Sequence, residues 1–503
     1  MTALMPAPSI DGFASDSVQN ALQNALQDYT ADFFPAENHF AESFTSADDD
    51  EIQQVWREVS KTLYDKNYDG RLTESAKIPP QETIPPEKNT FVSANPLTRD
   101  FDITAIRNDF PILSEKVHGR PLVWFDNGAT TQKPNAVIER LKYFYEHENS
   151  NVHRGAHDLA ARSTDAYENA REIVRKFLNA SSADEIIFVR GTTEGINLVS
   201  AAWGRDNVHA GDEIIVSHLE HHANIVPWQL LAQETGAVLK VIPVDENGDL
   251  RLEEYTNLLK SGRAKIVAVT QVSNAIGTIT PAQEIVRLAH QFGAAVLVDG
   301  AQSVSHIPTD VQTLDADFFV FSGHKIFAPT GIGVLYGKKA LLNAMRPYQG
   351  GGGMIADVTF EKTEYQPAPV RFEAGTGNIA DAVGLGAALD YVSSLGIENI
   401  RQYEHRLLEY ARSSLEFVPG IRIVGHPRER AGVVSFVHDS LSTEEINKGL
   451  AVEGIALRAG HHCAQPILRR YGWESTVRAS LAFYNTKDEI DFFVKKLTDF
   501  VQK

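Results

Sequence analysis

A carboxylate and a lysine each follow an apolar run of the chain. Residues 295–299 end in Asp299, and Ser322-Gly323-His324-Lys325 follows the apolar run 317–321. A lysine amine forms a Schiff base with an aldehyde, and a carboxylate keeps a pyridine nitrogen protonated so that the ring can withdraw electrons. The pair is therefore typical of a pyridoxal phosphate site. These residues alone leave open that Lys325 lies on the surface and that Asp299 caps a helix.

Polar side chains also follow three other apolar runs. Thr192 and Thr193 open a predicted helix whose free N–H groups suit a phosphate, although most such turns only cap helices. His221, in the segment after the run 213–217, can stack on a flat ring. A metal site is the alternative for the histidines there, but Glu220 is the one carboxylate nearby, so no metal-ligand set is expected. Asn274 follows the next run, and five such positions are hard to explain by packing.

The apolar runs predict the sheet that positions these residues. Most of them are continuous rather than alternating, as in strands covered on both faces, and helical segments lie between them. The candidate strands are residues 186–189, 213–217, 238–242, 265–270, 295–299, 317–321 and 333–336. Ligands of such sheets bind where strands end. Long helices at 397–417 and 487–502 and strands at 421–424 and 432–437 predict a smaller C-terminal α+β domain.

Length and composition exclude several classes of protein. The 503 residues suggest two or three domains, and the net charge of −19 argues against a nucleic-acid binder or a binder of acidic membranes. The sequence contains no run of about 18 apolar residues, so no membrane span is predicted. The first basic residue is Arg57, so no secretory signal is expected. The single cysteine, Cys463, excludes an internal disulfide and favours a cytoplasmic location.

Residues 1–100 differ from the rest of the chain. They hold about half of the net negative charge, and apolar residues recur at helical spacing in 16–34 and 50–64. Five prolines between residues 77 and 96 predict an extended linker. We therefore expect three parts: an acidic extension with its linker (1–100), a large domain that binds pyridoxal phosphate (101–389), and a small domain with the cysteine loop (390–503).

Residues from about 101 to 503 resemble the SUF-type (group II) cysteine desulfurases, which are fold-type I pyridoxal-phosphate-dependent transferases. The motifs that carry the resemblance are Asp126-Asn127-Gly128-Ala129-Thr130-Thr131, Asn151-Val152-His153-Arg154-Gly155, 190–197, 220–228, Val272-Ser273-Asn274, Asp299-Gly300-Ala301-Gln302, Ser322-Gly323-His324-Lys325, Phe372-Glu373-Ala374-Gly375-Thr376 and 458–466. The resemblance implies an α/β fold with a mainly parallel seven-stranded sheet, a smaller α+β C-terminal domain and a loosely ordered N-terminal extension.

The resemblance also implies a role for each matching residue. Lys325, Cys463 and His221 would be catalytic, with Lys325 as the Schiff-base lysine and His221 stacked on the cofactor ring. The other residues implied to bind the cofactor are Thr192, Thr193, Asn274, Asp299, Gln302, Ser322, His324 and Thr376. Thr376 would reach the phosphate of a neighbouring subunit, which implies a homodimer. Asn274 and Arg478, with Arg458 nearby, would bind the α-carboxylate of the substrate, for which an arginine offers a bidentate fork.

Cys463 completes the implied mechanism. It lies in Arg458-Ala459-Gly460-His461-His462-Cys463, where positive charge favours the reactive thiolate. The resemblance implies that L-cysteine is converted to L-alanine while a persulfide forms on Cys463. It also implies a dedicated sulfur acceptor of the SufE or SufU type. The alternatives are a selenocysteine lyase or a related β-eliminating enzyme, which need not depend on this thiol, and a non-catalytic interaction protein that kept the fold.

Two features depart from the ordinary group II pattern. Gly377 follows Thr376 where relatives often have proline. The extension of residues 1–100 is the larger departure and resembles that of cargo desulfurases of family 2A encapsulin shells. This resemblance implies a place inside an encapsulin nanocompartment. The alternative is an extension that packs on the enzyme or stays disordered.

Overall fold

The computed structural model describes residues 101–153 and 157–502. The helices expected at 16–34 and 50–64 and the linker at 77–96 lie outside the described residues. So do Arg154 and Gly155 of one quoted motif.

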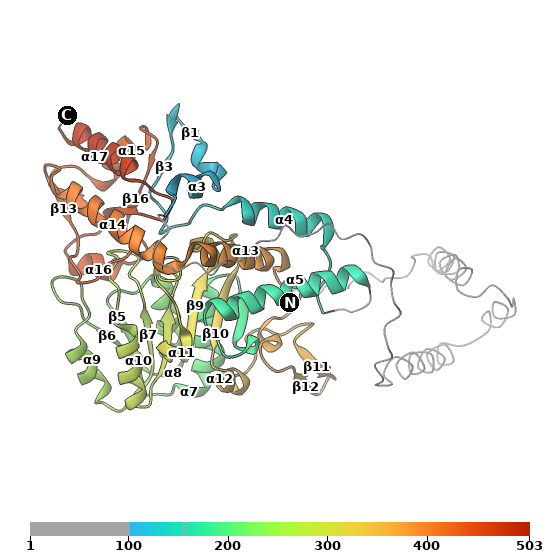
Figure 1. Ribbon diagram of the computed structural model, residues 1–503. Coiled ribbons are helices and arrows are strands. Elements are labelled where there is room, and N and C mark those ends of the chain that lie inside the picture. Colours follow the sequence, from blue (N-terminus) through green and yellow to red (C-terminus); the bar gives the residue numbers. More distant parts are fainter. Residues whose placement is uncertain (1–100, 154–156, 503) are drawn as a thin grey trace, which may run out of the picture. The chain divides into compact units, whose positions relative to one another are not determined.

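A seven-stranded sheet forms the centre of the larger part (Figure 1). Its strands are β4 (Ile186–Val189), β5 (Glu213–Ser217), β6 (Val238–Ile242), β7 (Ala264–Thr270), β8 (Ala295–Asp299), β9 (Phe318–Ser322) and β10 (Gly333–Gly337). Their spatial order is β4-β10-β9-β8-β7-β5-β6. Within this described sheet, β10 alone runs against the other six strands. The prediction of a mainly parallel seven-stranded sheet is confirmed.

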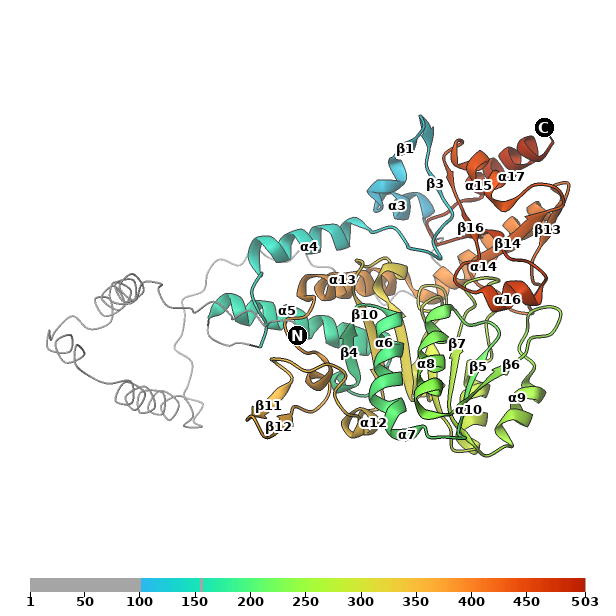
Figure 2. The same cartoon turned by 180° about the vertical axis from the view of Figure 1, so that it is seen from behind.

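Helices cover both faces of this sheet. On one side lie α5 (Asp158–Phe177), α10 (Ala282–Gln291) and α13 (Ile379–Leu395), and on the other lie α6 (Thr192–Val199) and α8 (Val226–Thr235). Figure 2 shows α6 and α8 in front of the strands. Strand β7 explains the continuous apolar runs, because Val267 and Val269 enter one core while Ile266 and Ala268 enter the other.

The C-terminal part contains a four-stranded antiparallel sheet. Its order is β13 (Ile421–Ile423), β14 (Val433–His438), β17 (Thr476–Ser480) and β16 (Arg458–Gly460). The core beneath it takes side chains from α14 (Ile397–Glu416), α15 (Thr443–Ala451) and α17 (Lys487–Val501). An early segment joins this core. β3 (Val123–Trp124) pairs with β15 (Ile455–Ala456), and Phe125 is fully buried there.

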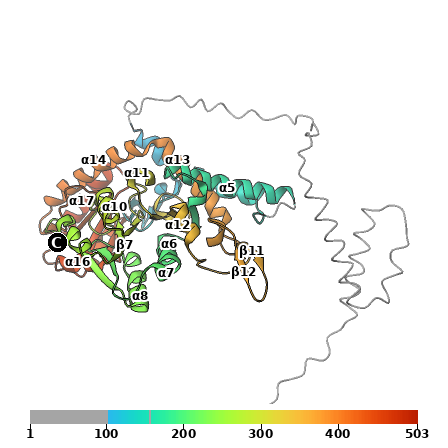
Figure 3. The same ribbon diagram turned by 90° about the horizontal axis from the view of Figure 1, so that it is seen from below.

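The remaining elements flank these two sheets. They are α3 (Ile103–Asn108), β1 (Lys116–Val117), β2 (Arg120–Pro121), α4 (Asn135–His147), α7 (Arg205–Asn207), α9 (Leu252–Leu259), α11 (Val311–Leu314), α12 (Lys339–Ala344), β11 (Ile355–Val358), β12 (Thr363–Tyr365) and α16 (Gln465–Arg470). Figures 1 and 3 show the β11–β12 hairpin projecting at the same end of this part as α5. The expected domain boundary at residue 389 falls within α13. None of the described helices is long and apolar enough to cross a membrane.

Strand β10 approaches the turn after β4 very closely. A Cβ atom added to Gly333 would lie 2.6 Å from the Gly191 Cα and 2.6 Å from the Phe321 carbonyl oxygen. Both neighbours are backbone atoms, so neither can turn away as a flexible side chain would. Only glycine therefore lets β10 lie between β4 and β9 at this point.

Gly333→Ala should reduce the free energy of unfolding by about 1–3 kcal/mol, because the added methyl group overpacks a backbone contact. Chemical denaturation of both proteins measures this difference. Gly350→Ala is the control, since no atom lies within 4 Å of its added Cβ. Equal stability of Gly333→Ala and the wild-type protein would show that the strands can separate at no cost.

Candidate active site

A cavity of about 220 Å³ opens at the carboxyl ends of the parallel strands. Its lining includes twelve of the thirteen residues that the sequence predicts for the site. They are Thr192, Thr193, His221, Asn274, Asp299, Gln302, Ser322, His324, Lys325, Arg458, Cys463 and Arg478. Thr376, the thirteenth, does not line the cavity and is exposed, with its Oγ1 3.4 Å from Asn151 Oδ1. Its predicted contact with a neighbouring subunit stays a prediction.

Lys325 and Asp299 face the same cavity from adjacent strands. Asp299 ends β8 and is 3% exposed, and Lys325 ends the 3-10 turn Gly323–Lys325 that follows β9. Desolvation lowers the pKa of Lys325, and Arg478 adds to this, while the Asp299 carboxylate acts in the opposite direction. A lowered pKa leaves more of the amine unprotonated, which is the form that attacks an aldehyde.

His221 presents a neutral ring to the cavity. Desolvation and then the positive charge of Lys325 lower its pKa to about 3. Its Nδ1 accepts a hydrogen bond from the backbone N–H of Ala223 at 3.0 Å. The proton of the neutral imidazole therefore sits on Nε2. An uncharged ring with one fixed donor can lie against an aromatic cofactor without repelling Lys325.

Glu220 holds the His221 segment in place. It is fully buried, and its carboxylate accepts hydrogen bonds from Ser217 Oγ, from Thr270 N at 3.0 Å and from Asn224 Nδ2 at 2.6 Å. Desolvation raises its pKa to about 8 despite these donors. The carboxyl group thus ties the end of β5 to the end of β7, next to the cavity.

The predicted phosphate-binding segment joins two strand ends. Ser322 Oγ accepts a hydrogen bond from Thr192 N at 2.8 Å and lies 2.8 Å from Thr192 Oγ1. Helix α6 begins at Thr192 without a side-chain cap, so N–H groups of its first turn lack helical partners. A Cβ on Gly191 would lie 3.1 Å from Ser322 Oγ, so glycine leaves room beside that hydroxyl. The segment offers hydroxyls and amide donors to an anion.

His324 is uncharged where it borders this segment. Desolvation and then Lys325 lower its pKa to about 4. Its carbonyl oxygen accepts hydrogen bonds from Thr131 N at 2.9 Å and from Thr130 Oγ1 at 3.1 Å. The loop after β3 therefore fixes the turn that carries Lys325.

Arg478 is the most enclosed charge in the cavity. It is 2% exposed, and it donates to Asp126 Oδ1 at 3.0 Å and to the Asn274 carbonyl oxygen at 2.9 Å. Arg458 lies opposite Arg478 across β16 and β17, and its Nη1 is 3.9 Å from Asp126 Oδ2. Desolvation raises the pKa of Asp126, and the two arginines oppose that shift. One carboxylate thus faces two guanidinium groups.

The Cys463 loop is tied to the large sheet from two sides. Asn274 Nδ2 donates to the His462 carbonyl oxygen at 2.6 Å, and His222 N donates to the Cys463 carbonyl oxygen at 2.7 Å. His462 and Cys463 both have left-handed backbone, with φ of 52° and 55°. This conformation is unfavourable for residues other than glycine. The bonds therefore hold the half-buried thiol at the cavity in a strained loop.

The residues present fit pyridoxal phosphate. Among the described residues, the one hydrogen bond to the Asp299 carboxylate comes from Ala301 N, so this buried acid can still accept from a pyridinium N–H. Gln302 donates from Nε2 to the Gly128 carbonyl oxygen at 2.7 Å, and its second amide hydrogen is free for a ring hydroxyl. The hydroxyls and free amides at the start of α6 suit the phosphate.

Sequence reasoning missed the roles of Asp126 and Glu220. Both stand in motifs quoted for the resemblance, but neither was assigned a function. Asp126 ends the short segment after β3, and its partner Arg478 lies more than 350 residues away in the chain. Glu220 could have been found from its position after a buried strand. Burial of a lone carboxylate there is costly unless several hydrogen-bond donors surround it.

The chain is similar to a known protein family and to several known enzymes. A family model described as aminotransferase class-V matches residues 123–493. The chain is 66% identical over 391 residues to a cysteine desulfurase of Synechococcus elongatus, covering 78% of this chain and 62% of that protein. It is 52% identical over 398 residues to a cysteine desulfurase of Escherichia coli O8, covering 79% of this chain and 98% of that protein. This chain therefore spans about three-fifths of the Synechococcus relative's length.

A solved structure agrees with the fold. The apo structure of a cysteine desulfurase from Thermococcus onnurineus has a TM-score of 0.76 to this chain at 37% identity. The match covers 79% of this chain and 98% of the solved one. The fold of the described residues thus has a counterpart in a solved relative.

The raised pKa of Glu220 predicts a pH effect on stability. The folded protein keeps this proton up to about pH 8, whereas an unfolded chain releases it near 4.5. The contribution of this group to the free energy of unfolding therefore falls as the pH rises through that window. Glu220→Gln cannot lose a proton, so its melting temperature relative to the wild-type protein should rise between pH 5 and pH 8.

Thermal melts of the two proteins at pH 5 and pH 8 measure this change. The amide loses a hydrogen bond with Asn224, which lowers stability equally at both pH values. The exposed Glu253→Gln is the control, and its difference from the wild-type protein should not change with pH. A pH-independent difference for Glu220→Gln as well would mean that Glu220 is ionised throughout.

Proposed function

Because the chain belongs to the class-V aminotransferase family, we propose that it is a pyridoxal-phosphate-dependent cysteine desulfurase. It would convert L-cysteine to L-alanine and leave the sulfur as a persulfide on Cys463. The observation that carries the proposal is the meeting of three groups in one cavity: the Lys325 amine, the Arg478 guanidinium and the Cys463 thiol. The curated relatives named cysteine desulfurase support it.

Substrate orientation follows from the fixed charges of the cavity. Arg478 keeps two of its nitrogens on Asp126 and Asn274, and its Nε has no hydrogen-bond partner although it is buried. Arg458 is half exposed and lies beside the same carboxylate. The α-carboxylate of an amino acid would enter between these two arginines, where its charge adds to that of Asp126 and balances them.

Proton transfer would use the Lys325 amine. Pyridoxal phosphate held by Lys325 and Asp299 would supply an electron sink for the bonds at the substrate Cα and Cβ. Lys325 would carry the Cα proton, since desolvation lowers the pKa of its amine and so favours the unprotonated form that accepts a proton. His221 stays neutral and can donate from Nε2 without adding charge.

Sulfur transfer would use Cys463 as the nucleophile. Its thiolate would attack the substrate sulfur, and the bond between that sulfur and Cβ would break. The electron pair of the broken bond would go to the carbon skeleton. A proton at Cβ completes alanine, and the new S–S bond holds the sulfur on the enzyme. We propose that an acceptor of the SufE or SufU type, as in SUF-type (group II) enzymes, then takes the sulfur in the cytoplasm.

Cys463→Ala should keep the bound cofactor but release no sulfide from L-cysteine in the presence of a reductant. The reason is that the thiol acts only after the substrate has been activated. Cofactor absorbance and sulfide release measure the two effects. Lys325→Ala is the matched variant, which should lose the cofactor linkage itself.

Assays of the wild-type protein and the same Cys463→Ala variant on L-cysteine and L-selenocysteine distinguish a desulfurase from a selenocysteine lyase. A selenocysteine lyase would keep its turnover of L-selenocysteine, because selenium leaves carbon more readily and needs no thiol acceptor. Sulfide release at the wild-type rate by the variant would rule out the persulfide route. Turnover of L-cysteine by the wild-type protein that is lost in Cys463→Ala supports the desulfurase, whereas a wild-type protein that turns over only L-selenocysteine would be a selenocysteine lyase.

We also propose that two chains form a homodimer and that residues 1–100 direct it to a partner. Thr376 is exposed in the single chain and would reach the cofactor phosphate of the other subunit. The acidic extension carries two apolar patches, at 18–33 and 52–64, that can fold onto a groove. We propose that this groove lies on the inner surface of an encapsulin shell, so that the enzyme would be packaged in a nanocompartment.

Deletion of residues 1–100 should leave the dimer and its activity largely intact, because the proposed site residues all lie beyond residue 100. The deletion should abolish packaging when the enzyme is co-expressed with a candidate shell, as measured by co-purification. A fluorescent protein fused to residues 1–100 should be packaged. If the fusion stays outside while the full-length enzyme enters, the targeting signal lies in the catalytic part.

A further inference from the structure

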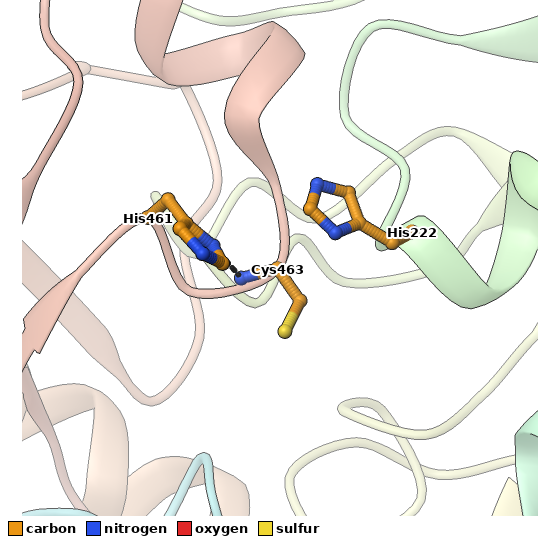
Figure 4. Close-up of side chains that lie close together, drawn as sticks. All are labelled: His222, His461 and Cys463. Atoms are coloured by element: carbon orange, nitrogen blue, oxygen red, sulfur yellow. Dashed lines mark hydrogen bonds between the residues drawn. The ribbon is translucent and has the colours of Figure 1, made fainter.

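Two histidines lie beside Cys463 although they come from distant segments. His222 opens the 3-10 turn His222–Asn224 after β5, and His461 lies in the loop between β16 and α16. Their ring centroids are 5.6 Å apart. One nitrogen of each ring and the Cys463 sulfur all lie within 4.8 Å of one another. Figure 4 shows the two rings on either side of the cysteine.

We propose that His222, His461 and Cys463 form a binding site for a thiophilic divalent cation such as Zn²⁺. Two imidazole nitrogens and a thiolate are three of the four ligands of a tetrahedral zinc site, and water can take the fourth position. Among the described residues, this is the one group of three or more such side chains whose ligand atoms converge in this way. The cation binding itself does not rest on the proposed desulfurase activity.

The backbone holds the two segments at the required separation. The His222 N–H donates to the Cys463 carbonyl oxygen at 2.7 Å, and this bond holds the turn against the loop. Zinc bond lengths of about 2.0–2.3 Å place tetrahedral ligand atoms roughly 3.4–3.6 Å apart. Side-chain rotations that bring the ligand atoms closer by about 1 Å complete the geometry. The exposed His461 gives the cation access from solvent.

Ligation has a defined cost at each ring. His461 Nδ1 accepts a hydrogen bond from Cys463 N at 3.0 Å, and His222 Nε2 accepts one from Gln465 N at 3.3 Å. A neutral imidazole has one lone-pair nitrogen, so a ring that binds the cation gives up its backbone bond. The cation gains two nitrogen ligands and a thiolate in exchange, and the thiol proton passes to solvent.

The proposed site has a consequence for sulfur transfer, and this part rests on the proposed function. A cation on the Cys463 sulfur occupies the lone pair that would attack the substrate sulfur. Binding would therefore block persulfide formation without displacing the cofactor, and removal of the cation by a chelator would restore it. The His222–His461 pair would thus make the enzyme sensitive to free thiophilic metal.

A Co²⁺ titration of the full-length holoenzyme tests the site, with a reductant that contains no thiol. Tetrahedral Co²⁺ has ligand-field bands at longer wavelengths than the cofactor absorbs. We expect one Co²⁺ per chain, displaced by Zn²⁺, and loss of the bands in Cys463→Ala. His222→Ala and His461→Ala should each weaken binding by at least about tenfold, since even changes outside the ligand set cost that much. Cofactor absorbance checks that each variant is folded.

His405→Ala is the matched control, because His405 is an exposed histidine of α14 away from the cluster, and it should bind Co²⁺ like the wild-type protein. The proposal is overturned if the wild-type protein binds no Co²⁺, or if neither His222→Ala nor His461→Ala weakens binding. Sulfide release with and without Zn²⁺ then tests the consequence. An enzyme that releases no sulfide even without metal contradicts the proposed function and leaves the titration result unaffected.

Discussion

The buried guanidinium of Arg478 is the constraint on which the rest of the site depends. A charge with 2% exposure has to be neutralised and hydrogen-bonded, or it destabilises the fold. Its two partners come from widely separated segments, Asp126 near the start of the described chain and the Asn274 carbonyl oxygen after β7. A Cβ on Gly128 would lie 3.0 Å from the Arg478 Cζ, so a side chain at this position would press against the guanidinium. These contacts fix where the small sheet meets the large one.

The same junction sets the position of the reactive thiol. Asn274 uses its carbonyl oxygen for Arg478 and its side-chain amide for the His462 carbonyl oxygen. Asn274, which follows strand β7 of the large sheet, therefore holds both Arg478 and the loop of Cys463. Arg478 itself lies on β17, beside the strand β16 that leads into that loop. A disturbance of the ion pair between Arg478 and Asp126 would consequently shift Arg478 and Cys463 together.

Much of the large sheet could be predicted from the sequence, because its strands are continuous apolar runs bounded by polar turns. The predicted strands 186–189, 213–217 and 295–299 have the same bounds in the structure. The antiparallel direction of β10 was not predicted, since a buried apolar run reads the same in either direction. The pairing of β3 with β15 was also missed. Two-residue strands have no periodic pattern, and their partners are more than 300 residues apart.

The two left-handed residues of the cysteine loop bear on the proposed departure of sulfur from the site. Each non-glycine residue in this conformation costs roughly 1–2 kcal/mol, so His462 and Cys463 together raise the energy of the inward loop. The hydrogen bonds from Asn274 and His222 offset that cost while the thiol stays at the cavity. Opening of these two bonds would let the backbone relax to an ordinary conformation. In the proposed transfer of sulfur to a second protein, this relaxation would offset part of the cost of breaking the bonds.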